Sequence, residues 1–156
     1  MKNIYIIGVL LFVGVIASVF FLKQESMHKA VFDCSSSKAS YIKSRMWLIG
    51  KTIDMIREDG GETDFVITLH GKCVPMISKL YDDIVEIEDI EDIRKAQEYI
   101  TELAEKKGVK VIACQMSLRS NNMKKEELLP FVKVTKNSFI DTIKLQNDGY
   151  GLMTFK

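Results

Sequence analysis

The chain has 156 residues and a formal net charge of +1, with 47% hydrophobic and 28% charged residues. This length and apolar content predict one folded domain and exclude a disordered chain. The near-neutral charge lacks the basic excess of proteins that bind nucleic acid, so we expect no nucleic-acid partner. Three cysteines are too few for a disulfide-stapled miniprotein, and their odd number leaves at least one unpaired.

The first segment of the chain is strongly apolar. Residues 4–22 contain no charged side chain and would span roughly 28 Å as a helix, close to the hydrocarbon thickness of a bilayer. Bulky residues close this run where a signal peptidase needs small ones, which favours an uncleaved anchor over a signal peptide. We therefore expect residues 1–23 to form a membrane anchor or signal helix, residues 24–29 a linker and residues 30–156 the folded domain.

The charges around the apolar segment give opposing indications of orientation. Four lysines follow the segment up to residue 43, which by the positive-inside rule favours a cytoplasmic domain. A short N-terminus with the single Lys2 before an apolar run is, by contrast, typical of exported proteins. We expect a single-pass anchor in the cytoplasmic membrane with the domain on the periplasmic side, and the opposite orientation stays open.

Strand and helix patterns alternate along the rest of the chain. Five short apolar runs predict strands, at residues 30–34, 65–69, 109–114, 132–134 and 150–155. Helical spacing predicts helices over residues 42–56, 74–81 and 90–104, and a capping box of Ser138 and Asp141 predicts another from residue 138. Because strands separated by helices need crossovers, this order predicts an α/β fold of three layers, α/β/α, with a mostly parallel five-stranded sheet.

Sulfur and polar residues gather where the first three predicted strands end. The residues at or just after these ends are Cys34, then His70, Gly71 and Cys73, then Cys114, Gln115 and Ser117. The carboxyl ends of parallel strands meet at one edge of a sheet, and ligands bind there. We therefore expect these residues to form the functional site.

Cys114 is the leading candidate among them, because residues 115–122 are predicted to begin a helix directly after it. A helix N-terminus stabilises a thiolate, and Arg119 would add positive charge if it folds back. This pattern indicates nucleophilic sulfur that attacks or accepts a sulfane sulfur. The alternative is a thiol buried as a small apolar side chain.

Four segments resemble the DsrE/DsrF-like family of small sulfur-relay proteins and follow the family's order. They are VFDCSS, FVITLHG, GVKVIACQMS and the closing LLPFVKVTKNSFIDTIKLQNDGYGLMTF. The resemblance implies a flavodoxin-like fold, assembly into trimers or hexamers, and a persulfide-carrying cysteine at Cys114. It places the family's His-Gly pair on His70 and Gly71 without assigning the pair a role. Cys34 and Cys73 lie outside the family's general pattern.

Other arrangements of the same residues stay open. Cys34, Cys73, Cys114 and His70 are zinc-ligand types, but they lack a C-x₂-C pair, and we predict no metal or cofactor. Cys34 and Cys73 could instead form a disulfide in an oxidising compartment and leave Cys114 free. A Cys–His hydrolase lacks an apparent third group to orient the histidine.

Residues 82–92 hold seven acids and no base. Their spacing does not match a calcium loop, so a solvated loop leading into a helix N-terminus is the preferred interpretation.

Together these patterns predict a membrane-anchored sulfur carrier or sulfurtransferase that passes sulfane sulfur through a Cys114 persulfide. Its expected partners are copies of itself and sulfur donors and acceptors, either proteins or small sulfur species. The alternative is a non-enzymatic oligomeric module that binds a small ligand or metal at the membrane surface.

Overall fold

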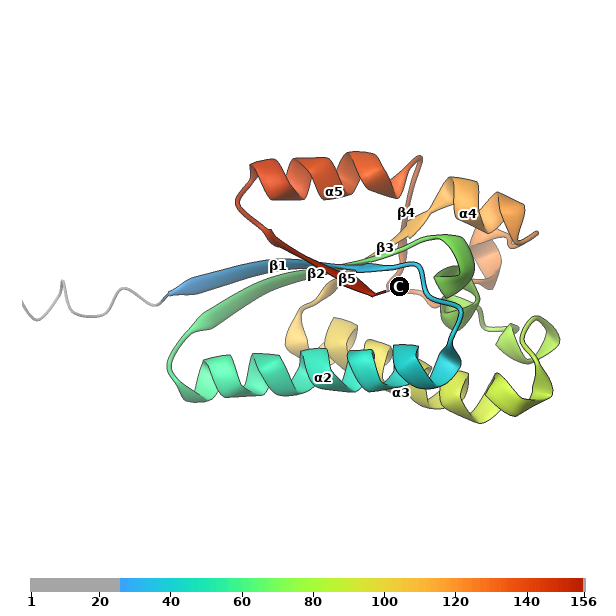
Figure 1. The fold of residues 1–156 in the computed structure, drawn as a ribbon, viewed down its shortest axis with the longest axis horizontal. Coiled ribbons are helices and arrows are strands. Elements are labelled where there is room, and N and C mark those ends of the chain that lie inside the picture. The colour runs from blue at the N-terminus through green and yellow to red at the C-terminus, as the bar shows by residue number, and fades with distance from the viewer. Residues whose placement is uncertain (1–25, 156) are drawn as a thin grey trace, which may run out of the picture.

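A parallel β-sheet forms the middle layer of the structure, with helices on both of its faces (Figure 1). The computed structural model describes residues 26–155. The sheet has five strands: β1 (Met27–Cys34), β2 (Glu62–Leu69), β3 (Lys110–Cys114), β4 (Lys133–Thr135) and β5 (Gly151–Phe155). Neighbouring strands pair in parallel in the order β4-β3-β2-β1-β5. The predicted three-layer α/β fold with a five-stranded parallel sheet is confirmed.

The predicted anchor, residues 1–23, lies outside the described residues. β1 begins at Met27, so part of the expected linker belongs to the sheet. The first residues of β1 pair with the first residues of β2, from Met27 opposite Glu62 onward. Within residues 26–155, no helix has the length and apolar character needed to cross a membrane.

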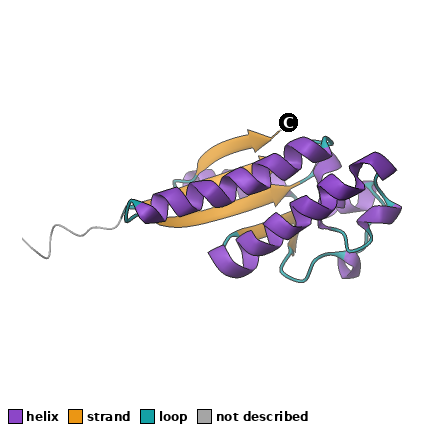
Figure 2. Cartoon of the chain, turned by 90° about the horizontal axis from the view of Figure 1, so that it is seen from below, coloured by secondary structure: helices purple, strands orange, loops and turns teal. Residues whose placement is uncertain are grey.

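Helices cover the two faces unequally. The helices are α2 (Ala39–Glu58), α3 (Ile90–Lys107), α4 (Gln115–Ser120) and α5 (Ser138–Asn147). α2 and α3 lie side by side across one face of the sheet, and α5 covers the other face (Figures 1 and 2). α4 stands beyond the carboxyl end of β3 (Figure 1).

The spacing of apolar residues explains why α2 and α3 pack on the sheet. The side chains that they bury recur every three or four residues: Ile42, Met46, Ile49 and Ile53 in α2, and Ile93, Ala96, Ile100 and Leu103 in α3. α3 also begins with acidic residues and ends with lysines, which complements the helix dipole. Gly108 follows it at φ 76°, a left-handed conformation that glycine adopts without strain.

Strand alternation divides the side chains of the sheet between its two faces. In β1, Ala30, Phe32 and Cys34 join the hydrophobic core that includes α2 and α3. Val31 and Asp33 occupy the alternate positions and face the α5 side. Side chains alternate in the same way in β2 and β3, where Leu69 and Ala113 belong to the core on the face covered by α2 and α3. Thr68 and Cys114 therefore face α5.

The short helix predicted over residues 74–81 is confirmed only in part. Residues 74–77 belong to the 3₁₀ helix η1 (Gly71–Ile77), which begins earlier and ends before an isolated bridge between Ser78 and Leu128. The backbone N–H of Lys79 donates to Glu127 at 2.7 Å, and that of Leu129 donates to Ile77 at 3.0 Å. Because these groups bond across to another segment, they are not available to continue a helix.

The predicted capping box at Ser138 was wrong. Asn137 is the N-cap of α5, and its side-chain oxygen accepts a hydrogen bond from the Phe139 N–H at 3.0 Å. The Asp141 carboxylate accepts a hydrogen bond from the Thr135 hydroxyl at 2.5 Å instead of returning to the helix start. The hydroxyl of Ser138 is thereby left for another role.

The acidic stretch at residues 82–92 forms two 3₁₀ turns and the start of α3, as the solvated-loop interpretation predicted. The turns are η2 (Tyr81–Asp83) and η3 (Ile87–Asp89). A further 3₁₀ turn, η4 (Lys125–Glu127), follows α4. Within residues 26–155, no group of three or more His, Cys, Asp or Glu side chains is arranged to hold a metal ion.

A disulfide joins Cys34, at the end of β1, to Cys73 in η1, and both side chains are fully buried. It closes a loop of 39 residues between two core elements. The structure thus supports the disulfide over the zinc arrangement among the alternatives left open by the sequence.

Replacing Cys34 and Cys73 together by serine is expected to lower the free energy of unfolding by about 4 kcal/mol, from the loop-closure entropy of the unfolded chain. Urea unfolding of the full chain, followed by the fluorescence of its single tryptophan, Trp47, measures this change. Cys114→Ser serves as the control, since it leaves the disulfide intact. A loss no larger than that of the control would contradict the structural role of the disulfide.

Candidate functional site

Cys114 is the free cysteine of the structure and the last residue of β3. Its side chain is 4% exposed and lines a cavity of about 180 Å³ on the α5 side of the sheet. The other residues that line this cavity are His70, Met116, Ser117, Asn137, Ser138 and Phe139. Cys114 also directly precedes α4, as the sequence predicted.

The register of the sheet places His70 beside Cys114. β2 and β3 pair Leu69 with Ala113, and the same register carried one residue further aligns His70 with Cys114. Neighbouring strands lie about 4.8 Å apart, so these two residues reach the same cavity. The phenyl ring of Phe139 packs edge-on against the imidazole, with 5.4 Å between ring centroids.

Gly71 turns the chain away from the sheet immediately after His70. Its φ of 56° lies in the left-handed region that glycine adopts at low energy. The Gly71 N–H donates to the Ser117 hydroxyl at 2.9 Å, and its carbonyl accepts from the Asn121 amide at 3.1 Å. These bonds fix α4 to the loop after β2 and so fix Cys114 relative to His70.

A carboxylate orients His70. The His70 Nε2 lies 3.1 Å from Asp33 Oδ2, and the Thr68 hydroxyl donates to Asp33 Oδ1 at 2.7 Å. The side chains of His70 and Asp33 are only 18% and 17% exposed. The sequence-based expectation that no third group orients the histidine was therefore wrong.

Two opposing effects set the pKa of the Cys114 thiol. Burial raises the pKa, because it disfavours the charged thiolate. The backbone N–H groups and hydroxyls of Ser138 and Ser117 can donate hydrogen bonds to the sulfur once it is a thiolate, and this lowers the pKa. The hydrogen bonds outweigh the burial, and the pKa of Cys114 lies below its usual value.

The Ser138 hydroxyl is a buried donor that needs an acceptor. Ser138 is 1% exposed, and its Oγ has no hydrogen-bond partner within the described chain. A buried hydroxyl without a partner is destabilising. Since Ser138 and Cys114 line the same cavity, a negative charge on the Cys114 sulfur is the acceptor that satisfies this hydroxyl.

The other predicted site residues lie elsewhere. Cys34 and Cys73 are joined in the disulfide and belong to the core under α2 and α3, on the opposite face of the sheet from Cys114. Gln115 is the first residue of α4 and is not among the residues that line the cavity. Arg119, in the last turn of α4, is also outside the cavity lining.

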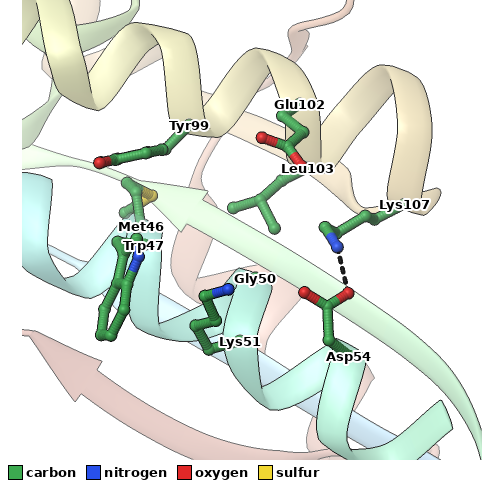
Figure 3. Close-up of a pocket in the computed structure, with 9 residues that line it drawn as sticks. All are labelled: Met46, Trp47, Gly50, Lys51, Asp54, Tyr99, Glu102, Leu103 and Lys107. Atoms are coloured by element: carbon green, nitrogen blue, oxygen red, sulfur yellow. Dashed lines mark hydrogen bonds and ion pairs between the residues drawn. The ribbon is translucent and has the colours of Figure 1, made fainter. Parts of the chain in front are cut away.

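A second hollow, of about 190 Å³, lies between α2 and α3 (Figure 3). Trp47 and Tyr99 flank one end of it, and Lys107 forms an ion pair with Asp54 at the other. It contains no cysteine or histidine and lies in the helix layer opposite α5. It is therefore not part of the Cys114 site.

The sequence of this domain matches a known family. The model of the DsrE/DsrF-like family matches residues 28–155, which includes all three cysteines and both histidines. The chain belongs to the DsrE/DsrF-like family. Membership confirms the resemblance seen in the sequence and supports a general connection with sulfur relay.

Two further comparisons describe relatives of this DsrE/DsrF-like chain. An uncharacterized protein of Aquifex aeolicus is 35% identical over 129 residues, which cover 81% of this chain and 56% of the relative. The chain thus spans little more than half the length of that protein. A protein of unknown function, MTH1491 from Methanobacterium thermoautotrophicum, has a similar structure with a TM-score of 0.58. It is 19% identical, and the match covers 82% of this chain and 99% of that one, so the likeness extends to the fold.

Three residues around Cys114 were not predicted from the sequence as site residues: Asp33, Thr68 and Ser138. Asp33 and Thr68 are paired in the register of β1 and β2, where each interrupts an apolar strand just before its end. A polar residue next to the carboxyl end of each of two successive buried strands is the sequence signal that could have identified Asp33 and Thr68. Ser138 gave no such signal, because its pattern also matched a helix cap.

Ser138→Ala is expected to raise the pKa of Cys114, because it removes a donor that favours the thiolate. The rate of Cys114 alkylation by iodoacetamide, measured against pH, gives this pKa, and the midpoint should move to higher pH in the variant. Thr142→Val is the matched control, since Thr142 carries a buried hydroxyl without a partner one turn along α5 but outside the cavity. Equal midpoints for Ser138→Ala and the unmodified chain would show that Ser138 does not act on the thiol.

Proposed function

We propose that this domain is a sulfur carrier in which Cys114 accepts a sulfane sulfur as a persulfide and passes it to another thiol. The observation that carries the proposal is the environment of Cys114. Its sulfur lies in a small cavity, and backbone N–H groups and hydroxyls of Ser117 and Ser138 stabilise negative charge on it. The same donors suit a persulfide anion, which places its charge one atom further into the cavity.

The arrangement of the other two cysteines supports a carrier over a thiol oxidoreductase. A persulfide collapses when a neighbouring thiolate attacks it and forms a disulfide. Cys34 and Cys73 are already joined to each other and lie on the opposite face of the sheet. Since the chain has no other cysteine, no thiol of the same chain is available to attack a persulfide on Cys114.

The loading step transfers one sulfur atom from a persulfide or polysulfide donor. The Cys114 thiolate attacks the outer sulfur of the donor, a new S–S bond forms, and the bond between the donor's two sulfurs breaks. The Cys114 sulfur is oxidised to the persulfide level, and the donor's inner sulfur leaves reduced, as a thiolate. Delivery repeats this exchange with an acceptor thiolate and returns Cys114 to its starting state.

The proposal includes the setting predicted from the sequence, an N-terminal anchor at residues 4–22 with the domain on the periplasmic side. The disulfide supports that side, because disulfides persist in oxidising compartments. Assembly into trimers or hexamers is part of the same proposal. The apolar side chains of Phe139, Ile140 and Ile143, which are exposed on α5, would suit such contacts.

A non-enzymatic ligand-binding module is the second candidate function. An apolar hollow of about 410 Å³ lies between α2 and the sheet, far larger than the Cys114 cavity. Phe32, Leu48, Phe65 and Met153 line part of it, and Arg45 lies at its wall. It would hold an apolar small molecule without involving Cys114.

The proposed function is tested by intact-protein mass spectrometry after exposure of the full chain to polysulfide. The unmodified chain is expected to gain one or more sulfur atoms, which a reductant removes, and Cys114→Ser should gain none. Cys34→Ser/Cys73→Ser with Cys114 retained is the control that separates persulfide formation from reaction at the disulfide. No gain in the unmodified chain, or an equal gain in Cys114→Ser, would refute the carrier and favour the ligand-binding module.

A further inference from the structure

Stabilising a persulfide on Cys114 does not require the hydrogen-bonded pair of Asp33 and His70. Both side chains are more than four-fifths buried, although burying polar and ionisable groups is unfavourable unless they are paired. Asp33 uses both oxygens, one toward the Thr68 hydroxyl at 2.7 Å and one toward His70 Nε2 at 3.1 Å. The donors that stabilise the Cys114 thiolate come instead from Ser117 and Ser138. The pair therefore serves another step.

The hydrogen bond to Asp33 determines which ring nitrogen of His70 is left unbonded. A carboxylate accepts a hydrogen bond, so the Nε2 facing Asp33 carries a proton. The other nitrogen, Nδ1, has no hydrogen-bond partner within residues 26–155 and is the one free to exchange a proton. Phe139 packs against the ring and restricts its rotation. This is the geometry of a positioned acid or base.

We propose that His70, positioned by Asp33, is the general acid that protonates the departing thiolate when Cys114 takes sulfur from an alkyl persulfide. The inference rests on the proposed function and adds to it the role of His70 and the class of donor. It stands on three placements: His70 beside Cys114 in the register, both residues lining one cavity, and a buried carboxylate behind the imidazole.

The step balances in atoms and charge. The Cys114 thiolate attacks the outer sulfur of R–S–S–H, and the S–S bond of the donor breaks. The inner sulfur takes the proton from the His70 imidazolium and leaves as R–SH, while Cys114 becomes Cys–S–S–H. The negative charge of the thiolate and the positive charge of the imidazolium cancel, and the imidazole recovers its proton from solvent. The electron pair of the Cys114 thiolate forms the new S–S bond, and the electron pair of the broken bond stays on the inner sulfur of the donor, so no other oxidant is required.

The requirement for an acid identifies the donor class. An alkyl thiol has a pKa of about 8.5, so its thiolate is a poor leaving group at neutral pH and benefits from protonation. The thiolate of an aryl persulfide is far less basic and departs without help. A general acid at this position is therefore useful with alkyl persulfides, such as a persulfidated cysteine side chain or peptide.

The test compares an alkyl persulfide with an aryl persulfide as donors to the full chain. Single-turnover loading of Cys114 is followed by mass spectrometry for the unmodified chain and the His70→Gln and Asp33→Asn variants. His70→Gln is expected to slow loading from the alkyl donor by at least about 100-fold and to change loading from the aryl donor by less than tenfold. Asp33→Asn keeps the shape of the side chain but removes the carboxylate, and it should slow the alkyl donor selectively as well.

The control is His28→Gln, which removes the only other histidine and should affect neither donor. A purely structural role of His70 would slow both donors equally, and no role would slow neither; both results overturn the inference while Cys114 still loads. Failure of the unmodified chain to load from either donor would overturn the proposed function itself, and the inference with it. Urea unfolding of each variant, followed by Trp47 fluorescence, separates loss of the fold from loss of the acid.

Discussion

The site depends above all on the parallel register of β1, β2 and β3. Side chains alternate between the faces of a strand, so the register decides which residues share the α5 side. In this register Asp33 lies opposite Thr68, and His70 follows beside Cys114, while Cys34 and its disulfide face the core under α2 and α3. A slip of one residue would move Asp33 or Cys114 to the other face of the sheet. The carboxylate, the imidazole and the thiol would then no longer share one side.

The sequence was sufficient to predict the fold and the edge of the sheet that carries the site. Continuous apolar runs and helical spacing defined the strands and the two long helices, because these signals come from burial on one or two faces. The helix predicted over residues 74–81 ends at Ile77, because the backbone there bonds to residues about 50 positions later, which local spacing does not reveal. Asp33 was missed for a related reason, since a single polar residue in a strand has meaning only once its cross-strand neighbours are known.

The disulfide links the fold to the site without taking part in it. Cys34 is adjacent to Asp33, and Cys73 lies three residues after His70. The cross-link therefore ties together the two chain segments that carry the carboxylate and the imidazole, from the opposite face of the sheet. Its second effect is chemical: with Cys34 and Cys73 bonded to each other, Cys114 is left as the single thiol of the chain.

The cysteine of a sulfur carrier must be a good nucleophile when sulfur is loaded and a good leaving group when sulfur is delivered. Different residues around Cys114 act on these two requirements. A low thiol pKa makes Cys114 a good leaving group when sulfur is delivered, but it also weakens the thiolate as a nucleophile when sulfur is loaded. The hydrogen-bond donors of Ser117 and Ser138 assist delivery, since they stabilise the departing Cys114 thiolate. In the proposed mechanism His70 assists loading, because protonating the donor's leaving thiolate compensates for a weaker nucleophile. Both directions of transfer then proceed from one cysteine, without a second thiol in the cavity.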